Sequence, residues 1–141
     1  MKTSLKLKSI KVVLDTNVLL AGVFTPGVCE AILDGCRENP KYKVFGSKFI
    51  LKEFERKTVS KFRARLEEAQ EAVRVLKAGM ELVEPVNVPD GPCRDPNDLA
   101  ILGTCVAVDA DCLVTGDRDL LELKVFHSIP IFAPRVFLDQ M

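Results

Sequence analysis

The stretch that decides the fold is Val12-Val13-Leu14-Asp15-Thr16-Asn17-Val18-Leu19-Leu20. Two apolar runs flank a short polar triplet that begins with a carboxylate. A buried strand that ends on an aspartate places a negative charge at the edge of a sheet, where open α/β folds bind their ligands. Asp15 is therefore the first candidate for a functional residue.

Strands and helices are predicted to alternate along the rest of the chain. Short apolar runs rich in β-branched residues are typical of buried strands, and apolar residues at helical spacing are typical of amphipathic helices. Because helices separate the strands, we expect a parallel sheet covered on both faces, an α/β fold. The predicted strands are 10–14, 42–46, 81–86, 112–115 and 129–132, and the predicted helices are 18–24, 28–36, 47–58, 60–78, 98–108, 119–124 and 134–140.

Length and composition are those of an ordinary globular protein. The 141 residues are most simply one domain, 1–141, with 48% apolar and 28% charged residues. Apolar runs stay well short of the roughly 20 residues that span a bilayer, and the lysines at the start have no signal-peptide core behind them. We therefore expect a cytoplasmic protein without membrane association.

The cysteines and the single histidine exclude several common sites. The five cysteines form no CxxC pair and the only histidine is His127, so a structural zinc site lacks its usual ligand spacing. Cys29 and Cys36 lie seven residues apart and are predicted to share a buried helix face. Neither GxGxxG nor GKS or GKT occurs, which argues against a glycine-rich phosphate loop.

Further acids occur in settings comparable to that of Asp15. Asp117 follows a buried strand after the Gly116 turn, Asp98 opens a predicted helix, and Glu53 lies on another helix. Carboxylates gathered in one place repel each other unless a cation joins them. Mg²⁺ and Mn²⁺ prefer hard oxygen ligands and keep bound water, which suits phosphodiester hydrolysis. The acids therefore predict a divalent-metal site.

Most of these acids also have a purely structural explanation. Asp15 is a residue type that caps helices. The run Asp95-Pro96-Asn97-Asp98 has the pattern of a helix start, with Asp95 as N-cap and Asp98 facing the helix dipole, and the sequence does not separate this role from metal binding. Asp119 is expected to cap its helix rather than bind metal, and Glu53 alone is typical of a solvated side chain.

A basic stripe surrounds Glu53, although the net charge of the chain is zero. Its commoner meaning is a solvated helix face with ion pairs at i, i+4 spacing. Beside an acidic metal site, however, such a stripe would let a phosphodiester backbone approach. The stripe comprises Lys48, Lys52, Arg56, Lys57, Lys61, Arg63 and Arg65, with Lys57, Lys61 and Arg65 at helical spacing.

With these motifs the chain resembles the PIN-domain ribonucleases, and within them the bacterial and archaeal group usually described as toxins of toxin–antitoxin pairs. The resemblance covers nearly the whole chain and rests on the segments 13–19, 47–54, 95–98 and 113–121. It implies a three-layer α/β/α sandwich around a central parallel sheet, with the acids converging at its carboxyl edge. It also implies endonucleolytic cleavage of single-stranded RNA that depends on Mg²⁺ or Mn²⁺.

The resemblance also assigns roles to residues and partners. The metal-binding and catalytic acids of the family fall on Asp15, Glu53, Asp98 and Asp117, and Asp119 matches an additional acid of many members. Asn17 and Thr115 are expected to position substrate, and Lys52, Lys57 and Lys61 to bind RNA. The implied partners are an antitoxin and a second copy of the chain in a homodimer. A PIN nuclease of RNA processing or maturation without a toxic role, and a non-catalytic RNA-binding domain, remain as alternatives.

Overall fold

The computed structural model describes residues 8–89 and 93–141. The predicted loop 87–96 therefore includes residues 90–92, which lie outside the described part, as does nearly all of the lysine-containing start. The strands are β1 (Ile10–Leu14), β2 (Tyr42–Gly46), β3 (Glu81–Leu82), β4 (Cys112–Val114), β5 (Val125–Phe126) and β6 (Ile129–Phe132). The helices are α1 (Thr16–Phe24), α2 (Val28–Glu38), α3 (Lys48–Phe62), α4 (Leu66–Ala78), α5 (Pro96–Val108), α6 (Arg118–Leu123) and α7 (Pro134–Gln140).

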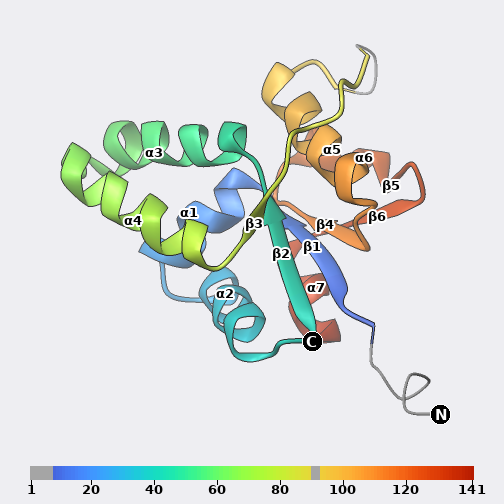
Figure 1. The fold of residues 1–141 in the computed structure, drawn as a ribbon, viewed down its shortest axis with the longest axis horizontal. Coiled ribbons are helices and arrows are strands. Elements are labelled where there is room, and N and C mark those ends of the chain that lie inside the picture. Colours follow the sequence, from blue (N-terminus) through green and yellow to red (C-terminus); the bar gives the residue numbers. More distant parts are fainter. Residues whose placement is uncertain (1–7, 90–92) are drawn as a thin grey trace.

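The strands form one sheet in the order β3-β2-β1-β4-β6-β5 (Figure 1). Every neighbouring pair is parallel except β5 and β6, which are antiparallel. The central strands β1 and β4 are buried on both faces, and Val13 and Leu113, which pair across them, are fully inaccessible. The predicted parallel sheet is confirmed, while the short edge strand β5 was not predicted.

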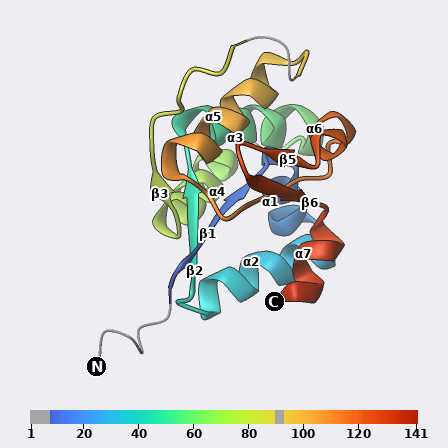
Figure 2. The same cartoon turned by 90° about the vertical axis from the view of Figure 1, so that its right-hand side faces the viewer.

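Helices cover both faces of the sheet and complete the three-layer sandwich. The chain moves from β1 to β2 and β3 in one direction, then returns through α5 to β4 on the other side of β1. Because such crossovers are right-handed, this reversal puts α5 on the face opposite to α1–α4. Helix α5 packs on β1 and β2, α1 packs on α2 and α3, and α7 lies beside α2 (Figure 2).

The same reversal creates the place for a site. β1 and β4 are neighbours, but the chain leaves them toward opposite sides of the sheet. Ligands of open α/β folds bind in the crevice at the carboxyl ends of such strands. In Figure 1, α3, α5 and α6 gather at this upper end of the sheet, whereas α2 and α7 lie at the lower end.

The predicted boundary between helices 47–58 and 60–78 lies too early, because α3 continues to Phe62 and α4 begins only at Leu66. Arg63 adopts a left-handed conformation with φ of 54° and ends α3. The backbone N–H of Arg65 then donates to the Glu68 carboxylate at 2.9 Å and begins α4. Leu66, the first residue of α4, has an exposed fraction of 50%.

The predicted strand 81–86 is correct only at its first two residues. After β3 the Val83 N–H donates to the Gly46 carbonyl, and the chain then leaves the sheet in extended form. Residues 84–88, called the strap below, cross α5, where the Val86 N–H donates to the Gly103 carbonyl at 3.0 Å. A Cβ at position 103 would clash with the Val86 carbonyl oxygen, so glycine permits this approach.

The cysteine prediction is confirmed in its main point. All five cysteines are free thiols, with Cys36 buried and Cys29 partly buried on α2. Among residues 8–89 and 93–141, no single helix is long and apolar enough to cross a membrane. The pair α1 and α2 passes that test together by length and composition, but it is bent by 95°.

Candidate active site

Thr115 joins the carboxyl ends of the two central strands. Its hydroxyl donates to the Asp15 carboxylate at 2.6 Å and accepts the Asp117 backbone N–H at 2.9 Å. Asp15 occupies the N-cap position of α1, yet its side chain accepts no capping hydrogen bond. The capping explanation for Asp15 therefore fails, and the residue lies buried at the carboxyl end of β1, only 4% exposed.

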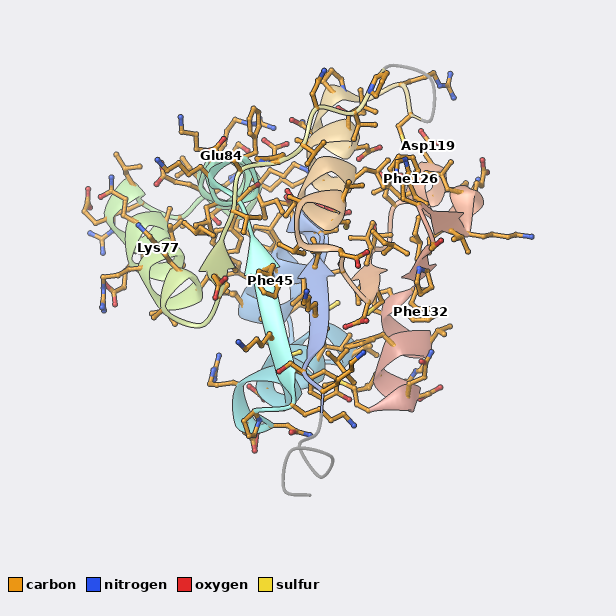
Figure 3. All side chains as sticks on the ribbon, turned by 45° about the vertical axis from the view of Figure 1, so that its right-hand side comes forward. Phe45, Lys77, Glu84, Asp119, Phe126 and Phe132 are labelled. Carbon is orange, nitrogen blue, oxygen red and sulfur yellow. The ribbon has the colours of Figure 1, made fainter. Side chains whose placement is uncertain are left out.

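Three further carboxylates gather beside this bridge. One oxygen from each of Asp98, Asp117 and Asp119 lies within 4.8 Å of the other two. Asp98 is buried in the first turn of α5, Asp117 is half-buried after β4, and Asp119 is exposed on α6. Figure 3 labels Asp119 at the start of α6, at the carboxyl end of the sheet. The three residues are called the acid cluster below.

The expected capping role of Asp119 was wrong. Asp117 is the N-cap of α6, and its carboxylate accepts the Asp119 backbone N–H at 2.8 Å. An aspartate that caps in this way still has oxygen lone pairs available for other partners. Asp119 lies in the first turn, where its carboxylate is free to join the acid cluster.

Burial and like charges make Asp98 the most perturbed acid of the site. Desolvation, followed by repulsion from Asp117, Asp95 and Asp15, raises the pKa of Asp98 to about 7. Burial also raises the pKa of Asp15, against the opposing hydrogen bond from Thr115. A carboxylate disfavoured in this way gains more than an ordinary one from a nearby cation.

The helix-start explanation of 95–98 is confirmed for Asp95. Its carboxylate accepts the Asn97 backbone N–H at 2.9 Å, and Pro96 occupies the first turn. Asp98 lies in that same first turn and is also a member of the acid cluster. The two roles are thus compatible at Asp98, since an acid in the first turn of α5 also projects toward the strand ends.

Glu53 occupies a different environment on α3. Both of its oxygens accept hydrogen bonds from Arg56, at 2.9 and 3.0 Å, and the Lys57 ammonium lies 3.7 Å away. These cations, Arg56 first, hold the pKa of Glu53 below its ordinary value. The Asn97 amide also donates to Glu53 at 3.2 Å and links α3 to the start of α5. Glu53 therefore borders the acid cluster without being part of it.

The basic stripe has one inward-facing member. The Lys57 ammonium donates to the side-chain amide oxygen of Asn17 (Oδ1) at 3.3 Å, which ties α3 to α1 beside Asp15. Lys52 and Lys61 are exposed along the same helix. Arg65 does not continue this helical repeat, because α3 ends before it.

The donor set suits a hard divalent cation. The acid cluster offers carboxylate oxygens from two helix starts, and Asp15 supplies a fourth carboxylate at the end of β1. Oxygen-only ligation of this kind is what Mg²⁺ and Mn²⁺ prefer. The arrangement can therefore bind a metal ion at the sheet edge.

The whole arrangement matches a known family. A family model described as PIN domain matches residues 11–119, a span that contains all but the first residue of β1 and the whole acid cluster. The chain belongs to the PIN-domain family. It is also 33% identical over 119 residues to an uncharacterized protein, MJ1680, of Methanocaldococcus jannaschii, covering 82% of this chain and 76% of the relative.

Three solved structures share the PIN fold with this chain. They are VapBC2 from Rickettsia felis bound to a DNA fragment from its promoter, VapBC-1 from nontypeable Haemophilus influenzae, and PAE2754 from Pyrobaculum aerophilum. Their TM-scores are 0.64, 0.60 and 0.61, with sequence identities of 17%, 14% and 14%. The matches cover 88%, 89% and 94% of this chain, and 98%, 99% and 96% of the matched chains. At these identities the likeness establishes the fold.

Two residues of this PIN domain were missed by sequence reasoning. Asn97 connects Glu53 to the start of α5, and Arg56 neutralises Glu53. The spacing of Glu53 and Arg56 at i, i+3 on one helix was a usable signal for their pairing. The contact of Asn97 with Glu53 joins residues 44 positions apart, which no local pattern reveals.

Proposed function

We propose that this PIN domain is a metal-dependent endoribonuclease that cleaves single-stranded RNA, and that it is the toxin of a toxin–antitoxin pair. The observation that supports this most strongly is the acid cluster, which lies beside the buried Asp15 at the topological reversal between β1 and β4. Membership of the PIN family supports nuclease chemistry at this place.

Asp98, Asp117 and Asp15 would hold Mg²⁺ or Mn²⁺, with Asp119 as an additional ligand at the exposed side. When bound, the metal supplies an activated water and neutralises charge on the phosphate. Thr115 keeps Asp15 and the Asp117 backbone in register through its two hydrogen bonds, so the ligand oxygens stay oriented.

The residues around the acid cluster would bring the RNA strand to it. Lys52 and Lys61 are exposed on α3 and would attract the phosphate backbone. Lys57 is fixed between Asn17 and Glu53, so its charge stays next to the crevice. The family resemblance makes Glu53 a metal ligand. Because its carboxylate is bonded to Arg56, it would have to release Arg56 before it could bind the metal ion.

The antitoxin proposal rests on the toxin-group resemblance and on the fold shared with the two VapBC structures. In this proposal a partner protein covers the acidic crevice and keeps the nuclease inactive. A second copy of the chain would form a homodimer. Co-expression with the product of an adjacent small gene, followed by size-exclusion chromatography, tests the partner and the dimer together.

The nuclease proposal is tested by incubating purified protein with single-stranded RNA, double-stranded RNA and single-stranded DNA of matched sequences. Each substrate is tested with Mn²⁺, with Mg²⁺ and with EDTA. We expect internal cleavage of single-stranded RNA with either metal and none in EDTA. Equal cleavage in EDTA, or intact RNA under all conditions, would contradict the proposal.

A further inference from the structure

We propose that a groove beside the acid cluster binds one unpaired base of the RNA strand, stacked on the ring of Phe49. The groove is formed by Phe49 of α3, the strap and the first two turns of α5. This inference rests on the proposed function, because it specifies how the RNA substrate of the same site is held.

The exposure of Phe49 is the first observation. Its exposed fraction of 61% is the highest among the exposed large apolar side chains of the described chain. Phe24 and Phe62, which are also exposed, stack on each other with ring centroids 4.8 Å apart. Within residues 8–89 and 93–141, Phe49 stacks on no other ring. The ring of Phe49 is therefore accessible to a ligand.

The groove has the size and the fixed walls that a planar ring needs. It encloses about 410 Å³, within the range of about 300–1,000 Å³ for small-molecule sites. Pro96, Leu99 and Ala100 of α5 contribute its apolar surface next to the strap. The strap itself is held by its hydrogen bond to Gly103, where only glycine allows so close an approach.

The groove adjoins residues that border the acid cluster. Phe49 and Ala100 also line a smaller pocket that includes Thr16, Glu53 and Asn97. Phe49 precedes Glu53 by four residues, so the two side chains lie on the same face of α3. A strand whose phosphate reaches the acid cluster would therefore bring a neighbouring base to Phe49.

The polar groups of the groove favour a base over a phosphate. Glu84 is among the lining residues, and its carboxylate would repel a phosphate but can accept a hydrogen bond from the amino group of a base. The Asn87 amide can both donate to and accept from a base edge. Figure 3 labels Glu84 in the upper part of the molecule, toward the end of the sheet where Asp119 lies.

The charges next to Phe49 complete the match to RNA. Lys48 and Lys52 are exposed on the same helix as Phe49. Lys52 follows Phe49 by three residues, so the two side chains are neighbours on the helix surface. Single-stranded RNA is typically held by unstacked bases on aromatic rings, with the backbone tracked by cations. A partner helix would instead need an apolar groove without a carboxylate in its wall. We therefore choose the nucleobase as the occupant.

The test compares Phe49→Ala, Phe49→Leu and Phe49→Tyr with Phe62→Ala, the matched control for an exposed phenylalanine of the same helix. Affinity for a fluorescein-labelled single-stranded RNA decamer is measured by anisotropy in EDTA, and kcat/KM for its cleavage is measured in Mn²⁺. Stacking of one base predicts roughly 5- to 150-fold weaker binding for Phe49→Ala. Phe49→Leu should lose most of this binding, while Phe49→Tyr and Phe62→Ala should retain it.

An abasic scan identifies the stacked position. Decamers with one base removed at successive positions should show one position where removal weakens binding to the unmodified protein. That penalty should vanish in Phe49→Ala, because the ring it depends on is gone. Binding and cleavage by Phe49→Ala equal to those of the unmodified protein would overturn the base site and leave the nuclease intact, as would be expected if a protein partner covers the groove. Failure of the unmodified protein to bind or cut any RNA would instead overturn the proposed function.

Discussion

The acid cluster and Glu53 lie near each other, but their carboxylates have opposite electrostatic surroundings. In the acid cluster, burial and like charges raise the pKa of Asp98 to about 7. On α3, Arg56 and Lys57 neutralise Glu53 and lower its pKa. Within the described part of the chain, the carboxylates of the acid cluster therefore lack a neighbouring cation, whereas Glu53 already has two, Arg56 and Lys57.

This difference indicates where a metal ion gains most. A cation at the acid cluster relieves repulsion that the fold has imposed, whereas a cation at Glu53 must displace two existing partners. The acid cluster is thus the main metal site in this account, and Glu53 is a rim carboxylate. The predictions below test this assignment in order of decreasing effect.

The largest effect is expected for Asp98→Asn, which keeps the side-chain shape but removes its charge. Metal-dependent cleavage should be abolished. In EDTA the variant should be as stable as the unmodified protein or slightly more stable, because one repulsive charge has gone. Cleavage in Mn²⁺ and denaturant unfolding in EDTA are measured on one preparation.

Asp95→Asn is the matched control for this substitution. Asn is as good an N-cap as Asp, so both stability and cleavage should stay close to those of the unmodified protein. If Asp98 only faced the helix dipole, Asp98→Asn would cost about 0.3–1 kcal/mol and leave cleavage near normal. A destabilised but active Asp98→Asn would therefore remove Asp98 from the site.

The second effect is stabilisation by metal. A ligand that binds only the folded state at a hundred times its dissociation constant adds about 2.7 kcal/mol to the free energy of unfolding. Mn²⁺ should therefore raise the melting temperature of the unmodified protein. The increase should be much smaller for Asp98→Asn. Equal melting temperatures with millimolar Mn²⁺ and with EDTA would be incompatible with a metal site.

The third effect is a pH dependence of stability in EDTA. The folded state keeps a proton on Asp98 up to about pH 7, while the unfolded chain releases it near its ordinary pKa of 3.8. The free energy of unfolding should therefore fall as pH rises through this window. Glu53 has the opposite sign: its lowered pKa gives stability that is lost only as the pH falls below its ordinary value of 4.5. Urea unfolding from pH 4 to 7.5 should show a decline that is smaller in Asp98→Asn, where the raised pKa of Asp15 still contributes.

The smallest effect concerns the basic stripe. Lys57→Ala combined with Lys61→Ala should weaken RNA binding and reduce its salt slope by roughly 0.7 for each phosphate that the protein no longer neutralises. Lys77→Ala, on α4 away from Asp119, is the control and should leave the slope unchanged (Figure 3). If the salt slope of the double variant equals that of the unmodified protein, Lys57 and Lys61 do not contact RNA and belong to a solvated helix face.

The fold could be predicted largely because its signals are local. Buried apolar runs located β1, β2 and β6 at their observed residues, and the Asp95-Pro96 start located α5 within two residues. Those runs alternate with helices, which was enough to predict a parallel sheet. The break between α3 and α4 was predicted at residue 59, too early in the chain, because Arg63 in a left-handed conformation carries no glycine or proline signal.

The site could be predicted only in outline. The acids at strand ends and helix starts were recognisable because parallel strands deliver their carboxyl ends to one edge. Which acids meet depends on the order of the strands, and that order decided that Asp119 joins Asp98 while Glu53 stays at the rim. The N-cap of α6 is Asp117, two residues before the expected Asp119, and propensity alone does not fix a helix start to that precision.

The most direct test of the central claim is a calorimetric titration of Mn²⁺ into the unmodified protein, Asp98→Asn and Glu53→Gln. If the acid cluster is the metal site, the unmodified protein should bind Mn²⁺ measurably and Asp98→Asn should not. Glu53→Gln should reduce binding only modestly, because the Glu53 charge is already paired with Arg56 and Lys57. Binding that survives in Asp98→Asn but disappears in Glu53→Gln would contradict the account and move the metal to α3.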